Sequence, residues 1–155
     1  MMRRNGILAT AAGAAVLALA PATGLAPAAD IESAAQAPRS GARYGGMTEE
    51  DKRISLRTSR TAIEIVAFRF DCVEAASGAT SLQAIRLRRR DDGYSFKISA
   101  RGIVSFSDEA PDENAAIAIR GRFSRSAKTV SGVLRVDAPR CDTGYVSWRA
   151  TRRRG

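Results

Sequence analysis

Beyond residue 50, apolar side chains alternate with charged or small polar ones, and this period of two is the strongest constraint on the fold. Short alternating runs are separated by turn-forming residues, a pattern typical of β-strands with one buried face. Helical periodicity is nearly absent over the same stretch. The pattern predicts strands at 53–58, 62–72, 83–89, 94–98, 102–107, 115–124, 129–137 and 145–150.

The inward positions of these strands supply enough apolar side chains for one core. They are Leu56, Val66, Phe68, Phe70, Ile85, Leu87, Phe96, Ile98, Ile117, Ile119, Phe123, Leu134, Val136, Val146 and Trp148. We therefore expect an all-β fold, an antiparallel β-sandwich of about eight strands. A closed up-and-down β-barrel is the alternative, because periodicity does not separate the two. Such a barrel would have room for a small apolar ligand, as lipocalin-type barrels do.

Turns and irregularities break the alternation at several points. Asp91-Asp92-Gly93 is a hairpin turn signal, because Asp tolerates and Gly favours positive φ. Ala75–Thr80 and Asp108–Asn114 are expected to be loops, and the weaker strand at 102–107 carries Ile103 as its main apolar residue. The apolar phase changes beside Glu64, so a β-bulge turns this acid outward or the strand is buried on both faces there.

The first 29 residues have the layout of a secretory signal peptide. Arg3 and Arg4 precede an apolar run at Ile7–Ala20, and small residues of the A-x-A type follow at Ala26–Ala28. An uncleaved membrane anchor is the alternative, but two prolines interrupt the stretch and its alanines are only weakly apolar. We expect export to the cell envelope or beyond, with no transmembrane span after cleavage.

The remainder divides by composition. Residues 30–43 are rich in small and polar residues and are expected to form a flexible linker. Residues 44–151 would form the domain and 152–155 a basic tail. The whole chain of 155 residues has a net charge of +9. Removing the signal peptide leaves 23 basic and 16 acidic residues, a charge of +7.

The only two cysteines are Cys72 and Cys141. In an oxidising compartment an isolated pair is most simply one disulfide, and the spacing is far from a redox C-x-x-C motif. The bridge would close a loop of about 70 residues and stabilise the fold by about 4 kcal/mol.

The absence of histidine limits the chemistry open to the chain. It excludes Ser-His-Asp and Cys-His catalytic pairs and metal sites that need imidazole. Two cysteines are too few for a four-cysteine zinc site or an iron–sulfur cluster, and no cofactor is expected. Acidic residues at 108–114 match no calcium-loop spacing, so a solvated loop is the better interpretation.

Arginines at alternating strand positions are the best functional lead. They would lie on the outer faces of the strands, where guanidinium groups suit phosphate and carboxylate anions. A generic solvated face is the alternative interpretation. The candidate anion-binding residues are Arg86, Arg88, Arg90, Arg120, Arg122, Arg135 and Arg149. The expected partner is a cell-wall or other anionic polymer. Nucleic acid is not expected, because aromatic residues suited to base stacking are scarce on these faces.

These features favour a monomeric, non-enzymatic binding domain with no identifiable catalytic residue. A carboxylate-dependent glycan hydrolase is the alternative, and it requires two carboxylates facing each other across a cleft. Trp148 is expected in the core near the bridge, with a sugar-stacking platform as the other interpretation. A glycan site requires Trp148 or Tyr145 to be exposed in a groove, and burial of both would exclude it.

Several of these residues also form an ordered skeleton. It consists of Tyr44-Gly45-Gly46 before Thr48, Phe68-x-Phe70-x-Cys72, Gly121-x-Phe123, Gly132-x-Leu134, Cys141-Asp142-Thr143-Gly144 and Trp148-x-Ala150. This skeleton resembles a group of short secreted bacterial β-domain proteins of unassigned activity. They share a Y-x-G-x-T opening, one disulfide and a C-[DS]-[ST]-G-x-x-x-W-x-A closing strand. The resemblance covers Tyr44–Ala150 and implies export, the bridge and an all-β fold, without catalytic residues.

Overall fold

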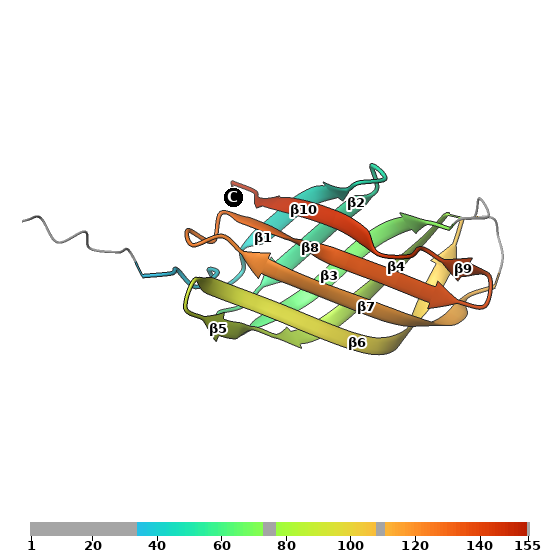
Figure 1. Ribbon diagram of the computed structural model, residues 1–155, viewed down its shortest axis with the longest axis horizontal. Helices are drawn as coiled ribbons and strands as arrows, with labels where there is room; N and C mark the ends of the chain where they lie inside the picture. Colours follow the sequence, from blue (N-terminus) through green and yellow to red (C-terminus); the bar gives the residue numbers. More distant parts are fainter. Residues whose placement is uncertain (1–33, 73–76, 108–110, 155) are drawn as a thin grey trace, which may run out of the picture. The chain divides into compact units, whose positions relative to one another are not determined.

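The computed structural model describes residues 34–72, 77–107 and 111–154, which form an all-β unit (Figure 1). Its strands are β1 (Arg43–Thr48), β2 (Arg53–Thr58), β3 (Ala62–Asp71), β4 (Ser77–Arg86), β5 (Arg88–Arg90), β6 (Gly93–Phe106), β7 (Glu113–Phe123), β8 (Thr129–Ala138), β9 (Cys141–Asp142) and β10 (Val146–Arg152). The all-β prediction is confirmed.

Eight of these strands close into an antiparallel barrel. Strands β1, β2, β3, β4, β6, β7, β8 and β10 pair in chain order, and β10 pairs with both β8 and β1. The short strands β5 and β9 extend the sheet beside β6 and β8. In Figure 1, β6, β7, β8 and β10 run in front of β2, β3 and β4. Of the two arrangements that periodicity leaves open, the structure has the closed up-and-down barrel.

The closing strand, β1, is absent from the predicted strands because its sequence RYGGMT contains two glycines, which strands disfavour. It nevertheless pairs along its length with β2 on one side and β10 on the other. A Cβ on Gly46 would lie 1.8 Å from the carbonyl oxygen of Arg149. The missing side chain therefore allows the close approach of β1 and β10 that completes the barrel.

Side chains fill the barrel interior. Tyr44 packs edge-on against Phe123, with ring centroids 5.4 Å apart, and its hydroxyl donates to the carbonyl of Ala127 at 2.8 Å. Phe96 lies between Phe123 and Trp148, at centroid distances of 6.3 and 6.2 Å. Trp148 is therefore a core residue, as predicted. With Phe68, Phe70 and Phe106 also buried, aromatic rings occupy the space that a ligand would need.

The observed strand β6 differs from the two strands predicted between residues 94 and 107. It is one strand of fourteen residues rather than two short ones. Its even-numbered positions face inward, so Val104 and Phe106 are buried. Ile103, the main apolar residue of the weaker predicted strand, is 62% exposed because the two runs form one strand with a single continuous phase. Residues 77–80, predicted as loop, begin β4.

The β-bulge predicted near Glu64 is present. The pairing of β2 with β3 runs from Arg57 opposite Ile65 directly to Thr58 opposite Ile63. Glu64 is the extra residue, and its carboxylate lies 2.9 Å from the guanidinium of Arg57. The bulge thus turns this acid outward into an ion pair. Of the two alternatives that the sequence left open at this point, the bulge is the one present.

A disulfide and backbone hydrogen bonds fasten two segments that lie outside the main strands. The disulfide Cys72–Cys141 joins the end of β3 to β9, as predicted, across a sequence separation of 69. Part of the segment predicted as a linker is bonded to the barrel, since the amide of Gln36 donates to Arg125 at 2.8 Å and that of Gly41 to Thr58 at 2.6 Å.

The predictions of an acidic loop and of no transmembrane span can be compared with the structure only over the described residues. The acidic loop at 108–114 includes residues 108–110, which lie outside the described ranges, while Glu113 forms an ion pair with Arg140. Over residues 34–72, 77–107 and 111–154, no helix is long and apolar enough to cross a membrane.

Candidate anion-binding groove

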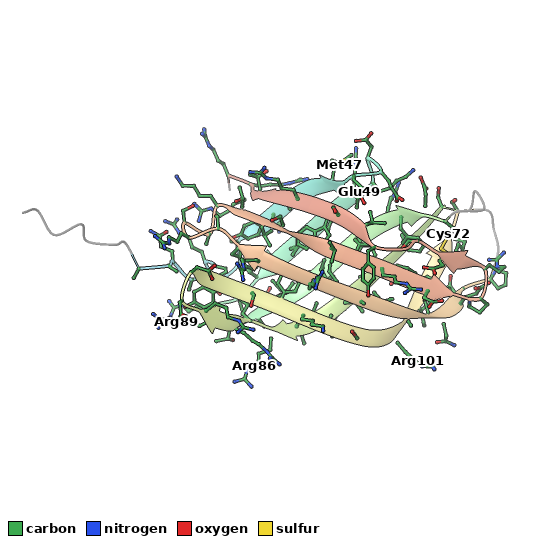
Figure 2. The ribbon with its side chains drawn as sticks, in the orientation of Figure 1. Met47, Glu49, Cys72, Arg86, Arg89 and Arg101 are labelled. Atoms are coloured by element: carbon green, nitrogen blue, oxygen red, sulfur yellow. A yellow bond between two sulfur atoms is a disulfide. The ribbon has the colours of Figure 1, made fainter. Side chains whose placement is uncertain are left out.

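The seven arginines predicted as anion-binding residues lie on the outside of the barrel, spread over β4, β5, β7, β8 and β10. Because the sheet closes, outward positions on successive strands point in successively different directions. Figure 2 shows Arg86 and Arg101 projecting on the side of the barrel opposite Met47. The structure therefore distributes these arginines around the barrel.

Two of the seven are neutralised by carboxylates. Arg122 lies 2.9 Å from Asp92 in the β5–β6 turn. Arg135 donates to both carboxylate oxygens of Asp142, at 3.1 and 2.8 Å, and lies 3.4 Å from Asp137. Such contacts satisfy the guanidinium within the chain, so these two arginines are less available to an external anion.

A different set of arginines lines a wide hollow on the described surface. This groove, of about 840 Å³, runs over the outside of β1 to β4 beside the C-terminal end of β10. Arg53 of β2, Arg69 of β3 and Arg153, just after β10, line it together with the exposed Met47. We call this the arginine groove.

Small residues form the floor of the arginine groove. In the register of the sheet Gly45 is opposite Ser55, and Ser55 is opposite Ala67. Three neighbouring strands thus present almost no side-chain volume outward at the same level. The groove is a consequence of this row, because longer side chains on either side of it stand higher.

Gly45 also positions one of the arginines. A Cβ built on this glycine would lie 2.3 Å from Nε of Arg153 and 2.5 Å from its Nη2. The guanidinium therefore lies flat on the strand, in space that any other residue would occupy. The amide of Arg153 donates to the carbonyl of Arg43 at 2.8 Å, which anchors the backbone beside β1.

The arginines of the groove differ in their surroundings from Arg122 and Arg135. Among the described residues, no carboxylate oxygen lies within 4 Å of the guanidinium groups of Arg53, Arg69 or Arg153. A guanidinium without a carboxylate partner offers its planar set of donors to external anions, and phosphate or carboxylate groups match that geometry.

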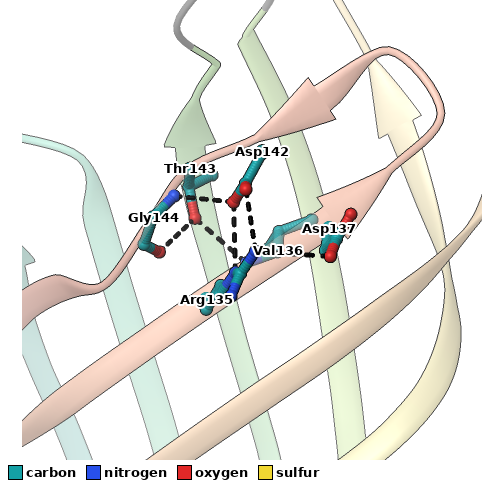
Figure 3. A network of polar contacts seen from close by, with 6 residues as sticks. All are labelled: Arg135, Val136, Asp137, Asp142, Thr143 and Gly144. Carbon is teal, nitrogen blue, oxygen red and sulfur yellow. Dashed lines mark hydrogen bonds and ion pairs between the residues drawn. The ribbon is translucent and has the colours of Figure 1, made fainter.

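The opposite situation is found in the segment Cys141–Tyr145, which we call the fastened loop (Figure 3). Besides binding Arg135, the Asp142 carboxylate accepts the amide of Gly144 at 2.9 Å. These two interactions, the Gly144 hydrogen bond first, lower the pKa of Asp142. The Thr143 hydroxyl accepts the amide of Val136 at 3.0 Å. This network holds the loop against β8.

The fastened loop also presents an aromatic ring. Tyr145 is 69% exposed, and the guanidinium carbon of Arg135 lies 5.8 Å from its ring centroid. The expected glycan platform is thus absent at Trp148, which is 3% exposed, but an aromatic side chain is available at Tyr145.

The structure offers little for the alternative hydrolase. Asp137 and Asp142 are cross-strand partners, but both bind Arg135. One carboxyl of a glycosidase pair must carry a proton, whereas the pKa of Asp142 is lowered. The pKa of Asp71 is also lowered, chiefly by its hydrogen bond from Lys52. Among the described residues, no group of three or more acidic, histidine or cysteine side chains has the arrangement of a metal site.

Arg53, Arg69 and Arg153 are not among the predicted site residues. A signal for them existed in the sequence, since Gly45, Ser55 and Ala67 are small residues at outward positions. Only the register shows that these positions align. No family model, curated protein or solved structure was found to match the chain.

Proposed function

We propose that this chain is an exported binding domain that holds anionic polymers of the cell envelope in the arginine groove. The observation that carries the proposal is the convergence of Arg53, Arg69 and Arg153, from different strands, on one hollow without a carboxylate partner among the described residues. Charges of one sign lining a concave surface attract and concentrate counter-ions.

The shape of the groove supports a polymeric ligand rather than a single ion. Its floor crosses three strands, about 5 Å apart from one strand to the next, so repeated anionic groups would meet successive arginines. Met47 adds an exposed apolar contact at the edge. A phosphate- or carboxylate-bearing chain matches this combination of spaced cations and a smooth floor.

Export is supported by two independent features. The N-terminal segment has the order of parts of a signal peptide. The disulfide Cys72–Cys141 is a bond that persists in oxidising compartments. An envelope location would bring the domain into contact with polyanions of the cell surface.

The test is the binding of long-chain inorganic polyphosphate, measured by calorimetry at low and moderate salt. We expect wild-type protein to bind at low salt and to weaken steeply as salt rises. The double variant Arg53→Ala/Arg69→Ala should bind at least about tenfold more weakly, because each lost charge-assisted contact contributes about 1.5 kcal/mol or more.

The matched control is Arg86→Ala/Arg101→Ala, which removes the same charge on the side of the barrel opposite Met47 (Figure 2). It should retain most of the affinity. Equal weakening by both double variants would show that net charge, not the groove, binds the polymer. Undetectable binding by wild type at low salt would contradict the proposal altogether.

A further inference from the structure

A second, smaller pocket lies on another part of the outer surface and shares no lining residue with the arginine groove. Its volume is about 150 Å³, the size of a cavity that accepts one six-membered ring. It lies over β6, β7 and β8, and the fastened loop contributes one wall. Its lining residues are Lys97, Ile98, Ser99, Ala118, Ile119, Arg120, Val133 and Tyr145.

Two cations meet at this pocket. Lys97 of β6 and Arg120 of β7 are cross-strand partners with exposed side chains, an arrangement that destabilises a sheet. Elsewhere such a pair is relieved: Arg43 and Arg57 are also partners, and Glu64 binds Arg57. No described carboxylate lies within 4 Å of Lys97 or Arg120. An external anion would relieve this repulsion.

The aromatic wall of the pocket is held in place. Tyr145 follows Gly144, whose φ of +61° is a left-handed conformation that suits glycine, and whose amide is bound by Asp142. The bond between Thr143 and Val136 fixes the loop from the other side. The ring is thus exposed and yet positioned, which lowers the entropy lost when it stacks on a ligand.

The remaining lining suits a sugar ring. Val133, at an outward position of β8, provides an apolar surface for its C–H groups, and the face of an aromatic ring attracts such weakly positive groups. The hydroxyl of Ser99 lines the same pocket and can exchange hydrogen bonds with a sugar hydroxyl. Lys97 and Arg120, which line the same pocket, can bind a carboxylate group of the sugar.

We propose that this pocket binds one uronic acid residue of an acidic polysaccharide, with the pyranose ring on Tyr145 and its carboxylate between Lys97 and Arg120. The site does not depend on the arginine groove, since the two share no residue. If both proposals hold, the polymer in the groove is an acidic polysaccharide, and one of its sugars binds in this pocket.

The test is titration with a galacturonic acid oligomer and with its methyl ester, which keeps the ring and removes the charge. We expect the acid to bind and the ester to bind at least about tenfold more weakly, because a charge-assisted contact is lost. Tyr145→Ala should weaken binding of the acid about three- to tenfold through lost stacking, whereas Tyr145→Phe should retain it.

Lys97→Gln separates binding from structure. Removing one member of the like-charge pair should raise the Tm slightly while it weakens binding of the acid roughly tenfold. A residue with only a structural role would not change the two in opposite directions.

The control is Arg89→Ala, which removes one exposed charge on β5 outside the lining of both hollows and should leave the affinity for the oligomer nearly unchanged. Equal binding of acid and ester, or full binding by Tyr145→Ala, would overturn the proposal. So would an equal loss of oligomer binding in the control, since net charge rather than the pocket would then bind the sugar. Absence of binding by wild type at millimolar oligomer would overturn it as well.

Discussion

The arginine groove and the fastened loop use the same residue type in opposite ways. In the loop, Arg135 is bound by Asp142 and Asp137, so its charge serves to hold β9 and Tyr145 against β8. In the groove, Arg53 and Arg69 have no such partner among the described residues. A basic composition therefore does not distinguish structural from available arginines, and the distinction depends on where carboxylates lie in three dimensions.

The largest expected effect on stability concerns the disulfide at Cys141, the first residue of the fastened loop. Cys72→Ala/Cys141→Ala removes the bridge between β3 and β9. We expect the free energy of unfolding to fall by about 4 kcal/mol, because the unfolded chain regains the freedom of a long loop. Urea unfolding measures it, and wild-type protein under reducing conditions should match the variant. A loss below about 1 kcal/mol would contradict this account.

The next effect concerns the strand that floors the groove. Gly46→Ala places a Cβ against the backbone of Arg149 and Ala150, which cannot move without separating β1 from β10. We expect a loss of about 3 kcal/mol, measured by urea unfolding. Gly45→Ala is the control, because its Cβ meets only the side chain of Arg153, which can swing away. If both variants lose equal stability, backbone approach is not the reason for Gly46.

A carboxylate introduced into the groove should make its arginines resemble Arg135 of the fastened loop. Ser55→Glu puts an acid on the floor beside the groove arginines, as Asp142 lies beside Arg135. Polyphosphate affinity should then fall about tenfold, a loss of about 1.4 kcal/mol in binding free energy. Gln83→Glu, an exposed residue of β4, makes the same charge change outside the groove lining. If it weakened binding as much, the location of the charge would be irrelevant.

The smallest effect is the acid sensitivity of the fastened loop. The folded-state pKa of Asp142 lies below its unfolded value, so its contribution to stability is complete above the unfolded pKa of about 4. That contribution is lost as the pH falls through the folded value. Asp142→Asn should therefore flatten the stability profile below pH 4 more than the exposed control Glu50→Gln does. Urea unfolding across this pH range provides the measurement, and parallel profiles for both variants would refute the assignment.

Much of the fold was predictable because it rests on local patterns. Alternation identified β2 with its observed bounds and placed β3, β7, β8 and β10 closely. The change of phase beside Glu64 indicated the bulge, and the isolated cysteines indicated the bridge. β1 was not predicted because its two glycines disfavour a strand by local propensity. They are needed because of the close approach of neighbouring strands, which local propensity does not take into account.

The site was harder to predict than the core. Periodicity shows that an arginine points outward, but its neighbours across the sheet depend on register. Arg53 and Arg69 meet at the groove because β1, β2 and β3 align three small residues. Likewise, the pairing of Lys97 with Arg120 follows from the register of β6 and β7, which local sequence patterns do not specify.

The sequence by itself determined the all-β class, the inward set of apolar side chains and the single bridge, because burial and alternation act over a few residues at a time. The tertiary structure decided that the sheet closes, through β1, and which outward charges are neutralised. Both are properties of strand neighbours far apart in the chain. A pair such as Arg149 and Met47 exists only once the barrel has closed and brought β10 beside β1.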